Sequence, residues 1–311
     1  MSPKYVLGIN CAYHESSATL LEDGVLVSAI EEERFNRAKH AKAARVDNPY
    51  VIPVNAIQYS LDKAGIEPNQ IERIGFSFLP ERRLMNIKVK DRTTKNDWGT
   101  SKGEITYNRL LSTVPYIVST LLEFDFSKRF VWLPHHICHA ASAYFVSGFD
   151  ESAVMSVDGI GEIDTTFFGV GVKNRLTQLY EGAKYPNSIG FIWEKFSKYL
   201  GFTEYDASKV MGLAGYGDKN RFYSKIKKLI KVSPNGLFEV DSIIMQFRIE
   251  DYRQLEKIFG PRRFPGGEIT QAHEDVAAAL QAVNDDVILH MVKNLSKKTK
   301  SHNLSMKSDG L

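Results

Sequence analysis

Two histidines, His135 and His139, stand four residues apart in the segment PHHICH. On a helix this spacing places both side chains on one face, one turn apart, where two imidazoles can bind the same metal ion. Asp158 follows an apolar stretch 19 residues after His139, at the point where a β-strand would end. In open α/β sheets the carboxyl ends of the strands face the ligand crevice. Two histidines and a carboxylate with open coordination positions favour Fe²⁺ or a similar divalent ion.

Cys138 lies inside the same segment, and a thiolate ligand would favour zinc. It stands three residues after His135 and one before His139, so it cannot easily join both in one coordination sphere. A small buried thiol is therefore the favoured interpretation of Cys138.

The polar turn CAYHESS, which follows the first apolar stretch, contains His14 and Glu15. A histidine in a loop between strands can act as a general base near neutral pH, because its ordinary pKa is about 6.5. A histidine that only caps the turn is the alternative. Lys39, in the charged run EEERFNRAKHAKAAR, is the nearest candidate cation for a phosphate or a developing oxyanion, although lysines in such runs are commonly surface residues.

Two glycine-punctuated segments are candidates for binding an anionic cofactor. In DGIGE, Gly159 and Gly161 would let backbone N–H groups approach a phosphate closely, but a hairpin turn has a similar sequence. The segment KVMGLAGYG, which begins at Lys209, is either a ligand loop or a helix C-cap followed by a turn. Gly159, Gly161 and Lys209 are therefore the candidate cofactor-binding residues.

The elements that must position these residues form a repeat. Apolar stretches predict strands over residues 5–10, 18–21 and 25–30, and Asp-Gly between the last two predicts a tight hairpin. The same order of strand, polar turn and hairpin recurs over residues 153–180. We therefore predict an α/β domain made of two related halves, residues 1–150 and 151–311, with a cleft between them.

Helices and further strands connect these hairpins. One long helix is predicted over about 274–298, because Val276, Leu280, Val283, Val287 and Met291 form a stripe along one face. This stripe is interpreted as core. The segment from residue 81 to 103 is expected to be a charged, irregular surface excursion. Other helices are expected over 54–66, 107–124 and 189–200 and through HHICHAASAYFVSG, and other strands over 71–78 and 130–133.

Composition excludes several classes of protein. The 311 residues are 43% hydrophobic with a net charge of +3, which argues against disorder and against a nucleic-acid-binding surface. No apolar run reaches the 18 residues of a membrane span, and the N-terminus lacks the apolar core of a signal peptide. With only two cysteines there is no disulfide framework, so a reducing, cytoplasmic location is expected.

Four motifs together resemble one family. The strings LGINCAYHESSATLLEDG, EEERFNRAKH, HHICHAASAY with SVDGIGE, and KVMGLAGYG occur in this order. They are similar to the NodU/CmcH-type O-carbamoyltransferases, which include nodulation-factor and antibiotic enzymes such as the tobramycin carbamoyltransferase. The resemblance extends from residue 5 to about residue 305.

This resemblance implies a fold and a reaction. The fold is an actin/hexokinase-type, ribonuclease H-like domain of two halves, followed by a YrdC-like domain. The YrdC-like domain makes carbamoyl-adenylate from carbamoyl phosphate and ATP, and the N-terminal domain passes the carbamoyl group to a small-molecule or sugar hydroxyl at a metal site. By resemblance, His135, His139 and Asp158 match the metal ligands, and His14 and Lys39 match active-site residues. Glu15 stands where the family usually has Asp.

The sequence departs from the family at its end. In members of the family, a segment like SHNLSMKSDGL runs on into a GGVALN-like nucleotide loop, whereas this sequence stops at Leu311. We therefore expect an incomplete second half and no C-terminal YrdC-like domain, which a separately encoded partner could supply. The alternatives are a non-catalytic fragment, one subunit of a split enzyme, or an actin-fold small-molecule kinase. A kinase would need a catalytic Asp in the first half, where the turn offers His14 and Glu15.

Overall fold

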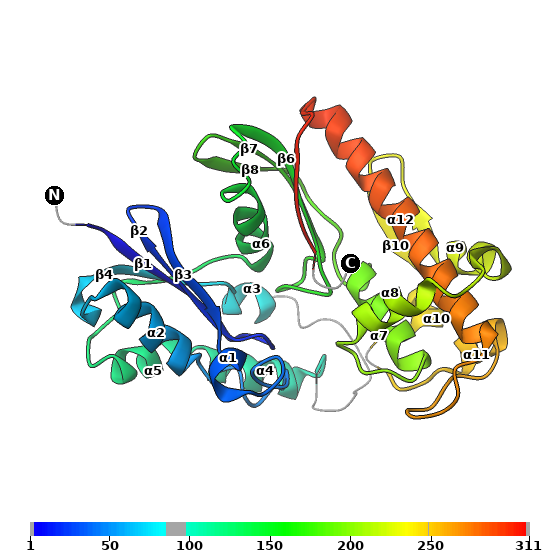
Figure 1. The fold of residues 1–311 in the computed structure, drawn as a ribbon, viewed down its shortest axis with the longest axis horizontal. Helices are drawn as coiled ribbons and strands as arrows, with labels where there is room; N and C mark the ends of the chain where they lie inside the picture. The colour runs from blue at the N-terminus through cyan, green and yellow to red at the C-terminus, as the bar shows by residue number, and fades with distance from the viewer. Residues whose placement is uncertain (1–2, 85–97, 248, 309–311) are drawn as a thin grey trace. The chain divides into compact units, whose positions relative to one another are not determined.

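The computed structural model describes residues 3–84, 98–247 and 249–308 (Figure 1). Two compact units divide the chain, residues 1–135 and 136–311. The division falls inside helix α6 (His135–Tyr144), immediately after its first residue. Within the described residues, none of the helices has both the length and the apolar character that crossing a bilayer requires.

The first unit is built on a five-stranded sheet with the order β3-β2-β1-β4-β5. The first three strands form an antiparallel meander, whereas β4 pairs in parallel with β1 and β5 in parallel with β4. The hairpin between β2 and β3 turns at Asp23 and Gly24, which both have positive φ (49° and 83°), as a type I′ turn requires. The strands are β1 (Tyr5–Asn10), β2 (Ser17–Glu22), β3 (Val25–Glu31), β4 (Ile71–Phe76) and β5 (Phe130–Trp132).

Helices of the first unit depart from the predicted pattern in two places. The single helix expected over 107–124 is wrong: α4 ends at Leu111 and α5 begins at Val114. Pro115 is the second residue of α5, where its missing N–H costs nothing, whereas in a continuous helix it would clash with the preceding turn. The irregular surface excursion expected over 81–103 is wrong at both ends, because helix α3 extends to Leu84 with Arg83 buried and helix α4 begins at Ser101. Residues 85–97 of this segment lie outside the described residues. The helices are α1 (Glu33–Asn36), α2 (Val54–Ala64), α3 (Pro80–Leu84), α4 (Ser101–Leu111) and α5 (Val114–Leu121).

The second unit repeats the topology of the first. Strands β6 (Glu151–Val157), β7 (Thr166–Val172) and β8 (Arg175–Tyr180) form an antiparallel meander, and β11 (Leu304–Ser308) pairs in parallel with β6. The sheet order is therefore β11-β6-β7-β8, which matches β4-β1-β2-β3 of the first unit. The predicted α/β class and topological repeat are confirmed, and the first sheet has the ribonuclease H-like strand order expected of an actin/hexokinase-type fold.

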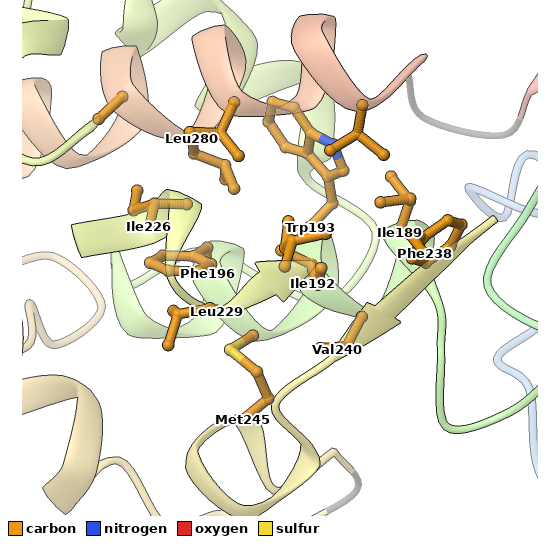
Figure 2. Close-up of a cluster of buried hydrophobic side chains, with 14 of the residues drawn as sticks. Ile189, Ile192, Trp193, Phe196, Ile226, Leu229, Phe238, Val240, Met245 and Leu280 are labelled. Atoms are coloured by element: carbon orange, nitrogen blue, oxygen red, sulfur yellow. The ribbon is translucent and has the colours of Figure 1, made fainter. Parts of the chain in front are cut away.

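The core of the second unit lies between α7 (Ile189–Tyr199), α12 (Gln271–Thr299) and the short β9–β10 hairpin (Ile230–Val232 and Phe238–Val240). Trp193 and Phe196 of α7 are fully buried here, beside Leu280 of α12 (Figure 2). The five apolar residues of the predicted stripe on α12 are each at most 1% exposed, so its interpretation as core is confirmed. The remaining helices are α8 (Ala207–Ala214), α9 (Tyr223–Lys227), α10 (Ser242–Met245) and α11 (Arg253–Phe259).

Two predicted elements end earlier than expected. Helix α6 was expected to extend through the Gly148 region, but it ends at Tyr144, where the Ser147 N–H donates to the Tyr144 carbonyl at 3.0 Å and closes a turn. Gly148, which follows this turn, has φ of 74°, a value that interrupts a right-handed helix. Strand β4 ends at Phe76 rather than at residue 78.

Candidate functional site

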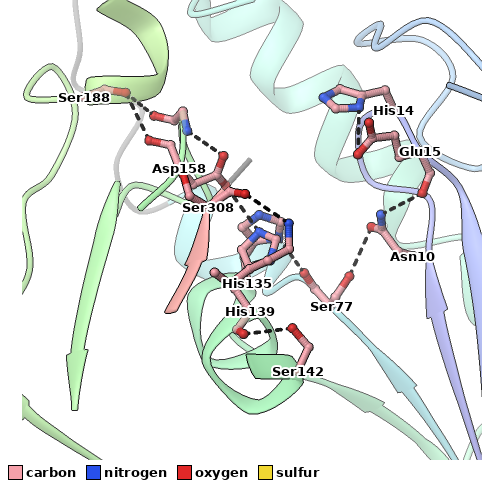
Figure 3. Close-up of polar contacts among 12 residues, drawn as sticks. Asn10, His14, Glu15, Ser77, His135, His139, Ser142, Asp158, Ser188 and Ser308 are labelled. Atoms are coloured by element: carbon pink, nitrogen blue, oxygen red, sulfur yellow. Dashed lines mark hydrogen bonds and ion pairs between the residues drawn. The ribbon is translucent and has the colours of Figure 1, made fainter. Parts of the chain in front are cut away.

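The candidate metal ligands lie on α6 and at the end of β6. His135 begins α6 and His139 follows one turn later, while Asp158 comes directly after Val157, the last residue of β6. One donor atom from each of the three side chains lies within 4.8 Å of the other two. His139 Nε2 lies 3.5 Å from Asp158 Oδ2 (Figure 3). The structure thus brings together the three residues that the spacing predicted.

Surrounding contacts orient His135. Its Nδ1 lies 3.1 Å from the backbone carbonyl of Ser77, which can only accept, so Nδ1 carries the proton and Nε2 keeps its lone pair for a ligand bond. This is the arrangement that histidine ligands of metals ordinarily show, with the second ring nitrogen bonded to a carbonyl or carboxylate. His135 is buried, and His139 and Asp158 are half-buried. The donor set therefore fits a divalent ion.

The backbone around Asp158 is also held in place. The Asp158 N–H donates to the carbonyl of Thr165, at 3.0 Å. The Ser188 hydroxyl, at the N-cap of α7, donates to the carbonyls of Asp158 (3.3 Å) and Gly159 (2.7 Å) (Figure 3). Gly190 of α7 approaches this turn so closely that a Cβ there would lie 2.5 Å from the Gly159 nitrogen. The start of α7 thus fixes the position of the turn that carries Asp158.

Cys138 does not join this group. Among the described residues, neither cluster of histidine, cysteine and carboxylate donors includes it. Burial raises the pKa of its thiol to about 12, which disfavours the thiolate that zinc binds. Cys138 is half-buried rather than fully buried, so its interpretation as a small buried thiol holds only in part.

The first turn brings His14 and Glu15 together with His40, which follows α1. The Glu15 carboxylate lies between the two imidazoles, with Oε2 at 3.6 Å from His14 Nδ1 and Oε1 at 3.3 Å from His40 Nδ1. The neighbouring His14 imidazole and, after it, the His40 imidazole lower the pKa of the Glu15 carboxyl to about 2, against the opposing effect of burial. The carboxylate is therefore ionised near neutral pH and can hold both rings in place.

A chain of hydrogen bonds inside the first unit connects this turn with His135, the first candidate metal ligand (Figure 3). Asn10 donates from Nδ2 to the Glu15 carbonyl at 3.3 Å, and its Oδ1 accepts from the Ser77 hydroxyl at 3.1 Å. The Ser77 carbonyl in turn binds His135. Asn10 is the last residue of β1, and Ser77 directly follows β4. Because β1 and β4 are parallel neighbours, the two side chains meet at the carboxyl ends of these strands.

Aromatic packing supports the same turn. The Tyr107 hydroxyl of α4 donates to the Ala12 carbonyl at 3.0 Å. Its ring stacks on Tyr13, with centroids 5.8 Å apart, and Tyr13 also meets the edge of His135 at 6.4 Å. Helix α4 itself is anchored by a buried, bidentate ion pair between Glu104 and Arg83, with both N···O distances at 2.7 Å.

The other predicted residues differ in exposure: Gly161 is buried, Gly159 is half-buried, and Lys39 and Lys209 are exposed. Lys39 is exposed in the turn that precedes His40, and its active-site role stays a prediction. The N–H of Gly161 donates to the Asp164 carbonyl and that of Gly159 to the Asp158 carboxylate, so an anion would have to displace contacts within the turn. Lys209 lies on α8, where its ammonium is 2.9 Å from Asp206. The cofactor roles of Gly159, Gly161 and Lys209 stay predictions.

Three functional candidates were not found from the sequence. His40 stands beside Lys39 in a quoted motif, but 25 residues separate it from Glu15, and only the fold shows that they meet. Asn10 and Ser77 have no distinguishing pattern, because an isolated Asn or Ser at a strand end is common. Their pairing could have been inferred only from the parallel alignment of β1 with β4.

Comparisons with known proteins agree with these motifs. The sequence profile described as Carbamoyltransferase N-terminus matches residues 5–310. An uncharacterised protein of Synechocystis is 31% identical, over 97% of this chain and 50% of its own length. The nodulation protein NolNO of Sinorhizobium fredii is 27% identical, over 96% of this chain and 40% of its own. Among solved structures, YeaZ from Pseudomonas aeruginosa matches with a TM-score of 0.33 and 14% identity, over 59% of this chain and 68% of that one.

The chain thus spans half or less of the length of these two curated relatives. The profile, by contrast, matches nearly every residue of it, from the first strand through β11. This match includes the first turn, α6 and the turn after β6. The chain belongs to the carbamoyltransferase N-terminus family.

Proposed function

We propose that this chain performs the transfer half of an O-carbamoyltransferase reaction. In this reaction the carbamoyl group passes from carbamoyl-adenylate to a hydroxyl of a small-molecule or sugar acceptor. The observation that carries the proposal is the family match over residues 5–310, which includes all the residues of the two donor clusters. The family is named for carbamoyl transfer, and the donor and acceptor come from the resemblance of the motifs.

His135, His139 and Asp158 would hold a divalent ion, with Fe²⁺ favoured by two imidazoles and one carboxylate. Such an ion supplies Lewis acidity, which stabilises negative charge on an oxygen of the donor. The Ser77 carbonyl keeps the His135 ring in the ligand orientation, and Ser188 keeps the Asp158 turn in place.

His14 is the proposed general base. The acceptor oxygen forms a bond to the carbamoyl carbon as the bond from that carbon to the adenylate oxygen breaks, and AMP leaves. The hydroxyl proton moves to the His14 imidazole, which Glu15 orients and whose cationic form the adjacent carboxylate stabilises. We assign Lys39 to the donor phosphate, and Gly159, Gly161 and Lys209 to the nucleotide.

We assign synthesis of carbamoyl-adenylate, from carbamoyl phosphate and ATP, to a YrdC-like domain or partner. The curated relatives are about twice as long as the part that this chain matches, which leaves room for such a domain in those proteins.

The test supplies carbamoyl-adenylate to the iron-loaded chain together with a panel of sugar and aminoglycoside alcohols. Carbamoylated product and AMP release are measured by mass spectrometry. We expect product from the wild-type chain, and a loss of about 100-fold or more in His14→Asn with iron content unchanged, the range that general-base catalysis supplies. His302→Asn, which removes an exposed histidine in the turn before β11, is the matched control.

Each outcome bears on a different part of the proposal. Transfer that persists in His14→Asn would exclude His14 as the base. Wild-type chain that releases neither AMP nor product with any alcohol would exclude transfer by this chain. Elemental analysis of His135→Ala tests the metal ligands separately, because unchanged iron content there would exclude the assigned site.

A further inference from the structure

We propose that His14, Glu15 and His40 form a second binding site for a divalent transition-metal ion, separate from the group on α6 and β6. All three residues lie in the first unit, and one donor atom from each lies within 4.8 Å of the other two. Two imidazoles with one carboxylate, and positions left for water, form a donor set that Zn²⁺, Co²⁺ and Fe²⁺ bind well.

The spacing of the donors matches such an ion. Metal bonds to imidazole nitrogen and carboxylate oxygen are about 2.0–2.2 Å long, so neighbouring ligand atoms around a tetrahedral ion are about 3.3–3.6 Å apart. His40 Nδ1 lies 3.3 Å from Oε1 of Glu15 and His14 Nδ1 lies 3.6 Å from Oε2, so each imidazole is at ligand-to-ligand distance from a different oxygen of the carboxylate. The His14 and His40 rings are inclined at 73° with their centroids 5.7 Å apart, so they converge on the carboxylate from different directions.

The backbone on both sides of the cluster is fixed. Glu15 and His40 both have left-handed backbone conformations, with φ of 57° and 62°, which are uncommon for residues other than glycine. The Glu15 N–H donates to the His40 carbonyl at 2.8 Å, and the His40 N–H donates to the Glu33 carboxylate at 2.7 Å. Asn10 holds the Glu15 carbonyl. The cluster is therefore assembled before any ion binds, which lowers the entropic cost of binding.

An ion can reach the cluster from solvent. The side chains of His14, Glu15 and His40 are 28%, 44% and 21% exposed, so water can complete the coordination on the open side. The site on α6 and β6 is more enclosed, with His135 buried and the His139 and Asp158 side chains 17% and 13% exposed. We therefore expect the second site to exchange its ion faster than the first.

Occupancy of this site has a consequence for transfer, and this step rests on the proposed function. An ion bound through the His14 imidazole uses the lone pair that would otherwise accept the proton of the attacking hydroxyl. Zn²⁺ at the second site is therefore expected to inhibit transfer, whereas the ion on α6 and β6 supports it.

The experiment measures Co²⁺ bound at equilibrium by the full chain, with elemental analysis after dialysis. We expect two ions per chain in the wild type, one in His135→Ala and one in His40→Asn. His302→Asn should bind as the wild type does. Asparagine is chosen at position 40 because it tolerates the left-handed conformation and keeps the backbone N–H that donates to Glu33. Circular dichroism of each variant checks that it is folded.

A second variant protects the test against misfolding of His40→Asn. Glu15→Gln keeps the shape of the side chain but removes its charge, and should weaken the second site by at least about 10-fold. Equal Co²⁺ binding by the wild type, His40→Asn and Glu15→Gln would overturn the proposal, as would a wild-type chain whose binding is abolished by His135→Ala. A chain that binds the second ion but transfers no carbamoyl group would leave this site standing and exclude the proposed function.

Discussion

Alanine at position 190 should weaken metal binding without touching a ligand. Gly190 is the second residue of α7, and its nearest neighbours belong to the turn that ends β6. A Cβ built there would lie 2.5 Å from the Gly159 nitrogen and 2.8 Å from the Asp158 carbonyl carbon. Both neighbours are backbone atoms, so neither can rotate away as the end of a side chain could.

The magnitude follows from these distances. Restoring an ordinary contact of about 3.5 Å requires a shift of about 1 Å between α7 and the Asp158 turn. Overpacking of this kind lowers the free energy of unfolding by about 1–3 kcal/mol. The better helix propensity of alanine offsets about 0.5–1 kcal/mol of this loss. We expect Gly190→Ala to be destabilised by about 1–2 kcal/mol. Because metal sites tolerate deviations of only about 0.2 Å, we also expect Co²⁺ affinity at His135, His139 and Asp158 to fall at least about 10-fold.

Urea unfolding of the metal-free chain and a Co²⁺ competition assay measure the two effects. Gly212→Ala is the matched control, since Gly212 lies inside α8 and a Cβ there would meet nothing within 4 Å. This control should be stabilised by about 0.5–1 kcal/mol, with metal affinity unchanged. Replacing glycine with alanine is thus expected to lower the free energy of unfolding at position 190 and to raise it at position 212. If Gly190→Ala kept both wild-type stability and wild-type affinity, the close approach of α7 to the Asp158 turn would be refuted.

Three further predictions concern contacts described above. Asn10→Ala removes the hydrogen bonds that connect the first turn with Ser77. It should lower the Co²⁺ affinity of the group formed by His135, His139 and Asp158 by up to about 10-fold in the same competition assay. Unchanged affinity would contradict this role of Asn10. Arg83→Met leaves the Glu104 carboxylate buried without its partner, so the free energy of unfolding measured in urea should fall by about 3–5 kcal/mol. A fall of less than about 1 kcal/mol would show that the pair is not buried in solution. Burial would raise the pKa of Asp206, but hydrogen bonds lower it to about 2, so the unfolded chain binds its proton first as the pH falls. The stability advantage of the wild type over Asp206→Asn, at most about 2.5 kcal/mol, should be full above pH 4 and vanish towards pH 2; an advantage constant over pH 5 to 2 would exclude this mechanism.

Elements set by local chemistry were predictable from the sequence. The hairpin at Asp23 and Gly24 follows from two residues that accept positive φ, and α12 follows from the spacing of its apolar stripe. The spacing of His135 and His139 was equally informative, because a single helix fixes the distance between them. Asp158 could be added because it follows an apolar strand directly.

Features that depend on distant residues were not predictable in the same way. Strand β11 was missed because LSMKS is short and acquires its pairing only from β6. His40 was missed as a neighbour of Glu15 for the same reason. Whether the N–H groups of Gly159 and Gly161 are available to a phosphate depends on the geometry of their turn. In this turn the Gly159 N–H donates to the Asp158 carboxylate and the Gly161 N–H to the Asp164 carbonyl. The break between α4 and α5, by contrast, has a visible signal in the sequence, because Pro115 is disfavoured inside a helix and favoured in its first turn.

The pairing of β11 with β6 sets an order of events during synthesis. Leu304 aligns with Ala153, so one side of β6 stays without its neighbour until roughly 150 more residues have left the ribosome. At about 5–20 residues per second this takes roughly 8 to 30 seconds, during which the nascent chain presents an open strand edge to other chains. The corresponding delay in the first unit is shorter, because Tyr5 of β1 pairs with Ile71 of β4, only 66 residues later. Protection of the nascent second unit by a chaperone is therefore expected to matter more for yield than protection of the first.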